Sequence, residues 1–408
     1  MQVAVIGGGA SGMMAAISAA GAGAKVTLYE RNDRVGKKLL STGNGKCNFS
    51  NRQLSTDYYY VKEPDKLAHI LNEFGTERVM EFFEAAGMVV KEKNGGLYPF
   101  SEQASTVLDI LRWQLKRKDV LVKTDAFVTA IDRTKEHKFA VHTATDTQIF
   151  DRVILSCGGK AAPKTGSDGN GYGLAQSLGH SLVPVVPALV QVKCREDFLK
   201  AVTGVRQEAC VTLLSDGMQL AKERGELQLT DYGISGIVTF QLSRLAAYAL
   251  QEKKQVTVLL DFFPDYTADH YDTFVRKRKA NADPNIFLEE FFTGMLNKKL
   301  MLLLIRLAGM SAGETYGQAE QKGIDRVFAL CRALSLTVSG VNSFEQAQVC
   351  AGGVPLSEIS ETMESRLVKG LYLTGELLDV DGKCGGYNLQ WAWSSGYIAG
   401  MHAAEDSL

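Results

Sequence analysis

Residues 36–51 bring a thiol and several positive charges together. They read GKKLLSTGNGKCNFSN, with Cys47 among small and polar residues and lysines at Lys37, Lys38 and Lys46. Nearby cations lower the pKa of a thiol and favour the reactive thiolate. The stretch is therefore open to two interpretations: a catalytic thiol, or a loop that cradles a bound group. The elements around it must decide between them.

The N-terminal stretch MQVAVIGGGASGMMAAISAAGAGAKVTLYE predicts the element that precedes this loop. Residues 3–6 are an apolar run typical of a strand buried on both faces, and an alanine-rich segment at residues 13–20 favours a helix. The stretch KVTLYE predicts a second strand that ends at Glu30. A strand, glycines, a helix, a strand and an acid in this order within about 30 residues indicate a dinucleotide-binding unit.

Three glycines and one acid would carry that binding. Gly7 permits the tight turn, Gly9 lets the backbone approach a pyrophosphate, and Gly12 lets the helix pack closely on the strand. The helix N-terminus, with Ala10 and Ser11, offers unpaired N–H groups to the phosphates. Glu30, followed by Arg31, favours a free ribose, as in FAD or NAD, over a 2′-phosphate.

The C-terminal stretch GLYLTGELLDVDGKCGGYNLQWAWSSGYIAG, residues 370–400, favours FAD over NAD. It predicts a strand ending at Gly375 and Glu376, then Gly385-Gly386, then a helix. Either Glu376 or Asp379 can bind ribityl hydroxyls, and the N–H groups near Gly386, Tyr387 and Asn388 can face the pyrimidine edge of a flavin. The positive end of the helix dipole would stabilise negative charge there.

Two further segments complete the predicted cofactor site. In DAFVTAI, Phe127 and Val128 are expected near adenine, and DRVILSCGG ends a strand at Cys157, Gly158 and Gly159, where backbone can approach the cofactor. The glycines of KTGSDGNGYGLAQSLGH are too irregular for a second dinucleotide fingerprint. No separate NAD(P)H domain is predicted, so NAD(P)H as a transient electron donor would have to visit the substrate site and leave.

The charge, the cysteine spacing and the apolar runs of the chain argue against several classes of protein. The formal net charge of −1 gives no global field for nucleic acid, although the run RKRK at residues 276–279 is either a solvated helix face or an RNA-docking patch. Seven cysteines without a CxxC pair argue against a disulfide framework, a zinc site or a dithiol motif, and fit a reducing cytoplasm. The chain has no apolar run of about 18 residues, so we expect no membrane span. A first strand at residue 2 leaves no room for a signal peptide.

These blocks together resemble the aminoacetone oxidase-like family of FAD-binding oxidoreductases, which includes bile-acid-pathway flavoproteins. The matching stretches are VIGGGASGMMAA, ERNDRVGKKLLSTGNGKCNFSN, TGSDGNGYGLAQSLGH, TDYGISGI and TMESRLVKGLYLTGELLDVDGKCGGYNLQWAWSSG. The resemblance implies tightly held FAD and a small-molecule or RNA substrate. The activities it implies are amine oxidation, reduction of ring or enone double bonds, and dihydrouridine formation in ribosomal RNA.

The expected fold class is α/β, a Rossmann-like FAD-binding domain interrupted by a β-rich insert and a helical subdomain. The predicted boundaries are residues 1–189 and 335–408 for the FAD domain, 190–264 for the insert and 265–334 for the helices. The sequence departs from the resemblance at Lys46, where many members have Arg, and at Asp231-Tyr232, where many have Thr-His. The oligomeric state is left open.

In this context the opening loop is predicted to pass beneath FAD. Lys37 and Lys38 would lie near ribose and pyrophosphate, and the flavin ring would meet Gly43, Asn44, Lys46, Cys47 and Asn48. Three roles for Cys47 stay open: packing beside the flavin, donating a proton to substrate, or acting as a nucleophile. The leading hypothesis is reduction of an activated C=C bond by hydride transfer from flavin N5, with Cys47 or Tyr232 as proton donor and Lys46 holding a carbonyl or phosphate. An amine oxidase and an RNA-modifying enzyme are the alternatives.

Overall fold

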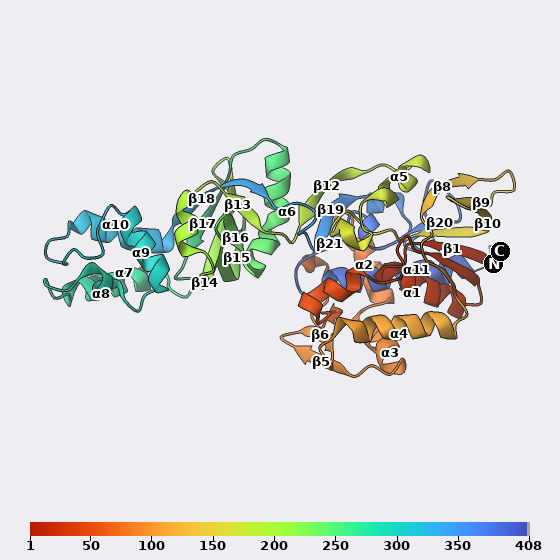
Figure 1. Ribbon diagram of the computed structural model, residues 1–408, viewed down its shortest axis with the longest axis horizontal. Helices are drawn as coiled ribbons and strands as arrows, with labels where there is room; N and C mark the ends of the chain where they lie inside the picture. The colour runs from red at the N-terminus through yellow and green to blue at the C-terminus, as the bar shows by residue number, and fades with distance from the viewer. Residues whose placement is uncertain (406–408) are drawn as a thin grey trace. The chain divides into compact units, whose positions relative to one another are not determined.

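The computed structural model describes residues 1–405 and divides them into two compact units (Figure 1). The first unit comprises residues 1–187 and 344 onward, and the second comprises residues 188–343. The FAD domain was predicted to resume at residue 335. The strand at Leu334–Val341 instead belongs to the second unit, and the first unit resumes at residue 344. Among residues 1–405, no helix is long and apolar enough to cross a membrane.

A parallel five-stranded sheet forms the centre of the first unit. Its order is β20-β11-β1-β2-β7, with β1 at Gln2–Ile6, β2 at Lys25–Tyr29, β7 at Leu121–Lys123, β11 at Arg152–Leu155 and β20 at Leu371–Leu373. In β1 and β2 every residue after the first is buried, as the apolar runs predicted. Parallel pairing brings the carboxyl ends of these strands to one edge, where ligands of open α/β sheets bind.

Two helices from opposite ends of the sequence pack together beside this sheet (Figure 1). These are α1 at Ala10–Gly21 and α11 at Tyr387–Ala404. Their contact depends on glycines in α11, because an added Cβ at Gly396 or Gly400 would lie 2.4 Å from a carbonyl oxygen of α1. The small residues of the C-terminal helix therefore permit close packing on the first βαβ unit, as the sequence predicted.

The remainder of the first unit surrounds this centre with helices and short sheets. The helices are α2 at Pro64–Glu73, α3 at Thr76–Ala85, α4 at Ala104–Arg117 and α5 at Asn170–Ser177. The short sheets are β3 at Ser50–Asn51 with β6 at Gly96–Pro99 and β5 at Val90–Lys93; β8 at Val128–Arg133 with β9 at Phe139–Thr143 and β10 at Thr147–Phe150; β12 at Val183–Ala188 with β19 at Val349–Gly353; and β4 at Tyr59–Tyr60 with β21 at Asp381–Gly382.

The second unit is built on a closed antiparallel barrel of order β13-β16-β15-β14-β17-β18. Its strands are β13 at Val192–Cys194, β14 at Arg206–Ser215, β15 at Met218–Leu229, β16 at Gly233–Ser235, β17 at Val256–Asp261 and β18 at Leu334–Val341. Its helices are α6 at Ile237–Gln251, α7 at Ala268–Ala280, α8 at Leu288–Phe292, α9 at Lys298–Leu307 and α10 at Gln321–Arg332. The barrel and the helices share one hydrophobic core. The expected α/β class, with a β-rich insert and a helical region, is confirmed.

Candidate functional site

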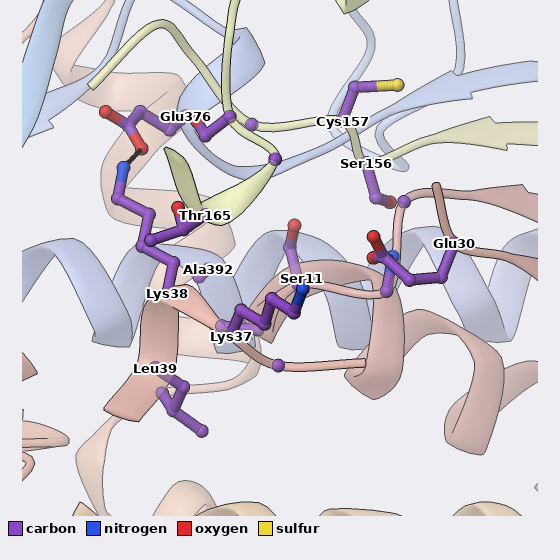
Figure 2. Close-up of a pocket in the computed structure, with 18 of the residues that line it drawn as sticks. Ser11, Glu30, Lys37, Lys38, Leu39, Ser156, Cys157, Thr165, Glu376 and Ala392 are labelled. Carbon is purple, nitrogen blue, oxygen red and sulfur yellow. Dashed lines mark hydrogen bonds and ion pairs between the residues drawn. The ribbon is translucent and has the colours of Figure 1, made fainter. Parts of the chain in front are cut away.

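A pocket lies in the first unit where the N-terminus of α1 meets the carboxyl ends of the strands (Figure 2). Every residue that lines it belongs to residues 1–187 or 344 onward. The lining comes from the glycine loop, the end of β2, the loop before Cys47, the segment after β11, and the C-terminal strand and helix. The polar side chains of this lining include Glu30, Lys37, Lys38, Cys157, Thr165 and Glu376.

The glycine loop shapes one wall of the pocket. Gly7 has φ +106°, and an added Cβ there would lie 2.4 Å from the Ser156 carbonyl oxygen. At Gly12 the added Cβ would lie 1.9 Å from the Gly7 carbonyl oxygen, so helix and loop touch backbone to backbone. At Gly9, by contrast, an added Cβ meets no protein atom within 4 Å. Gly9 also caps α1 without a side-chain hydrogen bond, which leaves the helix N–H groups for an anionic ligand.

Glu30 is held rigidly at the pocket by three N–H donors. Its Oε2 accepts from the Gly8 backbone N–H at 3.0 Å. Its Oε1 accepts from the Asn32 backbone N–H at 2.8 Å and from Asn32 Nδ2 at 2.7 Å. A carboxylate offers about four acceptor positions, so one is left for a ribose hydroxyl. Glu30 is only 7% exposed and lines the pocket, so its remaining acceptor position is available to a ligand bound there.

An ion pair lies on the other side of the pocket from Glu30, with Ser11 between them in the view of Figure 2. Lys38 Nζ lies 2.6 Å from Glu376 Oε2, and both side chains are only a quarter exposed or less. Glu376 Oε1 also accepts from the Cys350 backbone N–H at 2.7 Å. The pair joins the loop after β2 to the segment after β20, which are 338 residues apart in sequence.

The pocket fits FAD. Gly9 and the uncapped N-terminus of α1 suit the pyrophosphate, Glu30 suits the adenosine ribose, and Lys38 with Glu376 suits the polar ribityl chain. The lining includes these predicted cofactor residues: Gly7, Gly9, Ala10, Ser11, Glu30, Arg31, Lys37, Lys38, Val128, Cys157, Gly158, Glu376 and Asn388. Phe127, expected near adenine, also lines it.

The other predicted cofactor residues do not line this pocket. They are Gly12, Gly43, Asn44, Asn48, Gly159, Gly375, Asp379, Gly386 and Tyr387. Their contact with FAD stays a prediction. For two of them the packing is clear: an added Cβ at Gly386 would lie 2.5 Å from the Ser50 carbonyl oxygen, and the Tyr387 ring stacks on Tyr58 with centroids 4.6 Å apart. Asn388 reaches the lining, but its amide also pairs with both backbone groups of Gly382 at 2.8 Å.

The charges around Cys47 are all paired elsewhere. Lys37 Nζ lies 2.7 Å from Asp33, and Lys38 pairs with Glu376. Lys46 Nζ lies 2.7 Å from Glu102 Oε2. That carboxylate also binds Lys91, and the two lysines lower its pKa to about 2. Positive charge therefore does not activate the thiol.

Cys47 itself is fully buried, with φ +57°, and it packs in the core of the first unit. Burial raises the pKa of its thiol to about 12, against a smaller opposing effect of a hydrogen bond with Thr42. Neither Cys47 nor Lys46 lines the pocket. Tyr232 lies in the second unit, between β15 and β16, and is 39% exposed. The catalytic roles of these three residues stay predictions.

Sequence reasoning missed two parts of the lining. The segment after β11 contributes Thr165, Gly166 and Ser167, for which the sequence predicted no contact with the cofactor. Gln348 and Val349 also line the pocket, at the start of β19. The signal that was available was the density of glycines at residues 166–173, because such segments approach ligands closely.

The fold and the pocket define a Rossmann-type, FAD-binding protein. A family model, the HI0933-like protein Rossmann domain, matches residues 1–402. A 3-dehydro-bile acid delta(4,6)-reductase of Clostridium scindens is 43% identical over 99% of both chains. A ribosomal RNA dihydrouridine synthase of Haemophilus influenzae is 27% identical over 97% of both. The fold is also that of a 3-ketosteroid delta1-dehydrogenase from Sterolibacterium denitrificans, with a TM-score of 0.51 at 14% identity, covering 98% of this chain and 99% of that one.

The chain belongs to the HI0933-like family. This confirms the resemblance drawn from the sequence motifs. Together with the pocket, it identifies the protein as an FAD-dependent oxidoreductase.

Proposed function

We propose that this enzyme reduces a C=C bond conjugated to a carbonyl group in a small, largely apolar molecule. The observation that carries the proposal is the 43% identity, over 99% of both chains, to a protein named as a reductase of 3-dehydro-bile acids. The proposed substrate class is therefore a 3-keto steroid or bile acid with ring double bonds. Reduced nicotinamide is the proposed electron donor, and it binds transiently because the chain carries a single dinucleotide fingerprint.

When bound, FAD supplies the hydride for such a reduction, and the protein must supply a proton to the neighbouring carbon. Saturating one C=C bond consumes one hydride and one proton, so the balance needs one acid. We assign that role to Tyr232. Its hydroxyl accepts a hydrogen bond from Asn342 Nδ2 at 3.3 Å, which leaves the hydroxyl hydrogen available to a substrate. Its partial exposure contrasts with the buried Cys47.

The relative from Haemophilus influenzae supports the RNA alternative. The basic run at residues 276–279 supports RNA binding less than its four charges suggested. Arg278 donates to the Phe291 and Thr293 carbonyl oxygens at the end of α8. Lys279 Nζ lies 2.7 Å from Asp325. Arg276 donates to the Asp272 carbonyl oxygen and to Thr273 Oγ1. Three of the four residues of the run therefore have structural partners within the second unit. An oxidase of a small amine is the third candidate, and it would need no proton donor.

The test begins with the purified yellow protein, reduced without oxygen. The reduced enzyme is mixed with a 3-keto-4-ene steroid or with ribosomal RNA, and flavin reoxidation is followed by absorbance. The oxidised enzyme is mixed separately with a small aminoketone, and flavin reduction is followed in the same way. We expect rapid reoxidation by the steroid enone and slow reoxidation by air. Reaction in deuterated water should place deuterium on the carbon that receives the proton. Rapid reoxidation by air with stoichiometric peroxide, and none by enones, would refute the proposal in favour of an amine oxidase. Reoxidation by RNA alone would favour the RNA-modifying enzyme.

The assignment of the acid is tested separately. Tyr232→Phe should retain FAD and accept electrons from nicotinamide at an unchanged rate, but transfer them to the enone about 10²-fold or more slowly. Tyr266→Phe, at another exposed tyrosine of the second unit, is the matched control and should transfer electrons normally. Equal rates for Tyr232→Phe and the control would remove Tyr232 from the reaction.

A further inference from the structure

The segment that follows β11 closes one side of the FAD pocket, and we call residues 157–169 the strap. Five of its residues line the pocket: Cys157, Gly158, Thr165, Gly166 and Ser167. Figure 2 draws Cys157 and Thr165 among the lining side chains. The strap is therefore part of the wall of the FAD pocket.

The backbone of the strap is bent into a conformation that needs external support. Gly158, Gly166 and Gly169 have φ values of +70°, +102° and +88°. Ala162 has φ +56°, a left-handed conformation that costs a non-glycine residue roughly 1–2 kcal/mol. Strained conformations of this kind persist only where surrounding contacts fix them.

Two consecutive residues after Glu30 supply such contacts. Asn32 Nδ2 donates to the Thr165 carbonyl oxygen at 3.0 Å, and an added Cβ at Gly166 would lie 2.4 Å from the same nitrogen. Arg31 Nη1 lies 2.5 Å from Asp168 Oδ2. The Arg31 guanidinium also lies over the Phe127 ring, 4.8 Å from its centroid. We call Arg31, Asn32 and Asp168 the clasp.

Asn32 connects the strap to the cofactor-binding carboxylate. One hydrogen of its amide goes to Glu30 Oε1 and the other to the Thr165 carbonyl oxygen. Both partners can only accept, so the chemistry fixes which end of the amide is the nitrogen. A single amide group therefore links the position of the strap to the orientation of Glu30.

We propose that the clasp is a positioning device that sets the lifetime of bound FAD. Asn32 and Asp168 do not line the pocket, so they act through the strap and through Glu30. Release of FAD requires the Arg31–Asp168 ion pair and the Asn32–Thr165 hydrogen bond to break together. The inference rests on the FAD site and not on the identity of the substrate.

The test measures FAD release from the holoenzyme, with no substrate present, by the gain in flavin fluorescence when an excess of another apoflavoprotein traps free FAD. Asn32→Ala should release FAD about tenfold faster or more, the loss expected for a net hydrogen bond. Asp168→Asn, a conservative change at an exposed site, should release it about threefold faster at low salt. The controls are Asn72→Ala on the exposed face of α2 and Glu226→Gln, which breaks an exposed ion pair with Arg206 in the second unit.

Salt distinguishes the clasp from a general loss of stability. Release from the wild-type protein should accelerate between about 20 mM and 500 mM sodium chloride, because salt screens the exposed Arg31–Asp168 pair. In Asp168→Asn this acceleration should be lost, whereas both controls should keep it. Release rates within twofold of the wild type for Asn32→Ala and Asp168→Asn, with an unchanged salt response, would overturn the proposal. Because no turnover is involved, these outcomes are independent of whether the enzyme proves to be an enone reductase.

Discussion

The buried position of Cys47 leads to a quantitative prediction for Cys47→Ala. The substitution removes one heavy atom from a site with no exposure. Losing its burial costs about 0.8 kcal/mol, the value for one methylene-sized group. A residual cavity of roughly 25 Å³ costs about 0.6 kcal/mol more. Alanine keeps the same backbone strain at φ +57°, so the expected loss in free energy of unfolding is about 1.4 kcal/mol. For a unit of this size, that corresponds to a fall of about 3 °C in the melting temperature.

The same variant decides whether the thiol acts in catalysis. Removing a general acid lowers turnover by about 10²–10⁴-fold, whereas removing a packing side chain should change it less than about threefold. We expect Cys47→Ala to bind FAD, melt about 3 °C lower and turn over at close to the wild-type rate. Turnover can be followed with whichever acceptor proves active. A variant that keeps its FAD and its fold but loses turnover by 10²-fold or more would refute the reasoning from burial.

The rate of alkylation is an independent measure of how reactive the Cys47 thiol is. With a pKa of about 12, only about 10⁻⁴ of the Cys47 thiol is ionised at pH 8, compared with roughly a quarter of an ordinary thiol. Iodoacetamide should therefore modify Cys47 at least about 10³-fold more slowly than the same residue in the denatured chain. Mass spectrometry after a brief reaction measures this, and prompt labelling of Cys47 in the native protein would contradict the structure.

Three further predictions follow from packing and ionisation. Gly12→Ala should yield protein without FAD, seen as loss of visible absorbance, because the new Cβ cannot fit 1.9 Å from the Gly7 carbonyl oxygen; Gly173→Ala, where an added Cβ meets nothing within 4 Å, is the control. His180→Ala should lower the free energy of unfolding by about 3 kcal/mol in urea titrations without changing FAD release, because this buried side chain hydrogen-bonds Glu358 at 2.7 Å and Ser365 at 2.9 Å away from the pocket. Burial raises the pKa to about 12 for six of the seven thiols, so the folded state keeps protons that the unfolded state loses above pH 9. Stability should therefore be fully present below pH 9 and fall by up to about 1.4 kcal/mol per pH unit per thiol between pH 9 and 12, measured as melting temperature against pH.

The first βαβ unit could be predicted from sequence because its determinants are local. Gly7 has φ +106°, Gly12 packs on the Gly7 carbonyl oxygen within the same turn, and Glu30 directly follows β2. The C-terminal strand and helix were also predictable from their apolar pattern and small residues. The sequence pattern did not predict which way the backbone turns at Gly385-Gly386. Gly386 packs on Ser50 and the Tyr387 ring stacks on Tyr58, so these two residues do not line the pocket, whereas Asn388 does.

The environment of Cys47 could not be predicted for a different reason. Three lysines close in sequence suggested a positive environment, but two of their partners are remote in sequence. Glu376 is 338 residues from Lys38, and Glu102 is 56 residues from Lys46. Pairing across such separations depends on the fold, and so does burial of the thiol. The sign of the pKa shift was therefore decided by tertiary structure, and burial outweighed nearby charge.

The placement of the pocket bears on how relatives with one fold come to have different substrates. All of its lining lies in the first unit, so the second unit can change without loss of the cofactor site. The relatives at 43% and 27% identity carry names with very different substrates, a bile acid and ribosomal RNA. Differences in substrate should therefore follow from the second unit and from exposed positions such as Lys46. Asp231 and Tyr232 lie in that second unit, between β15 and β16 of its barrel. Exchanging Asp231-Tyr232 for Thr-His should accordingly alter the preference among acceptors while leaving FAD release unchanged.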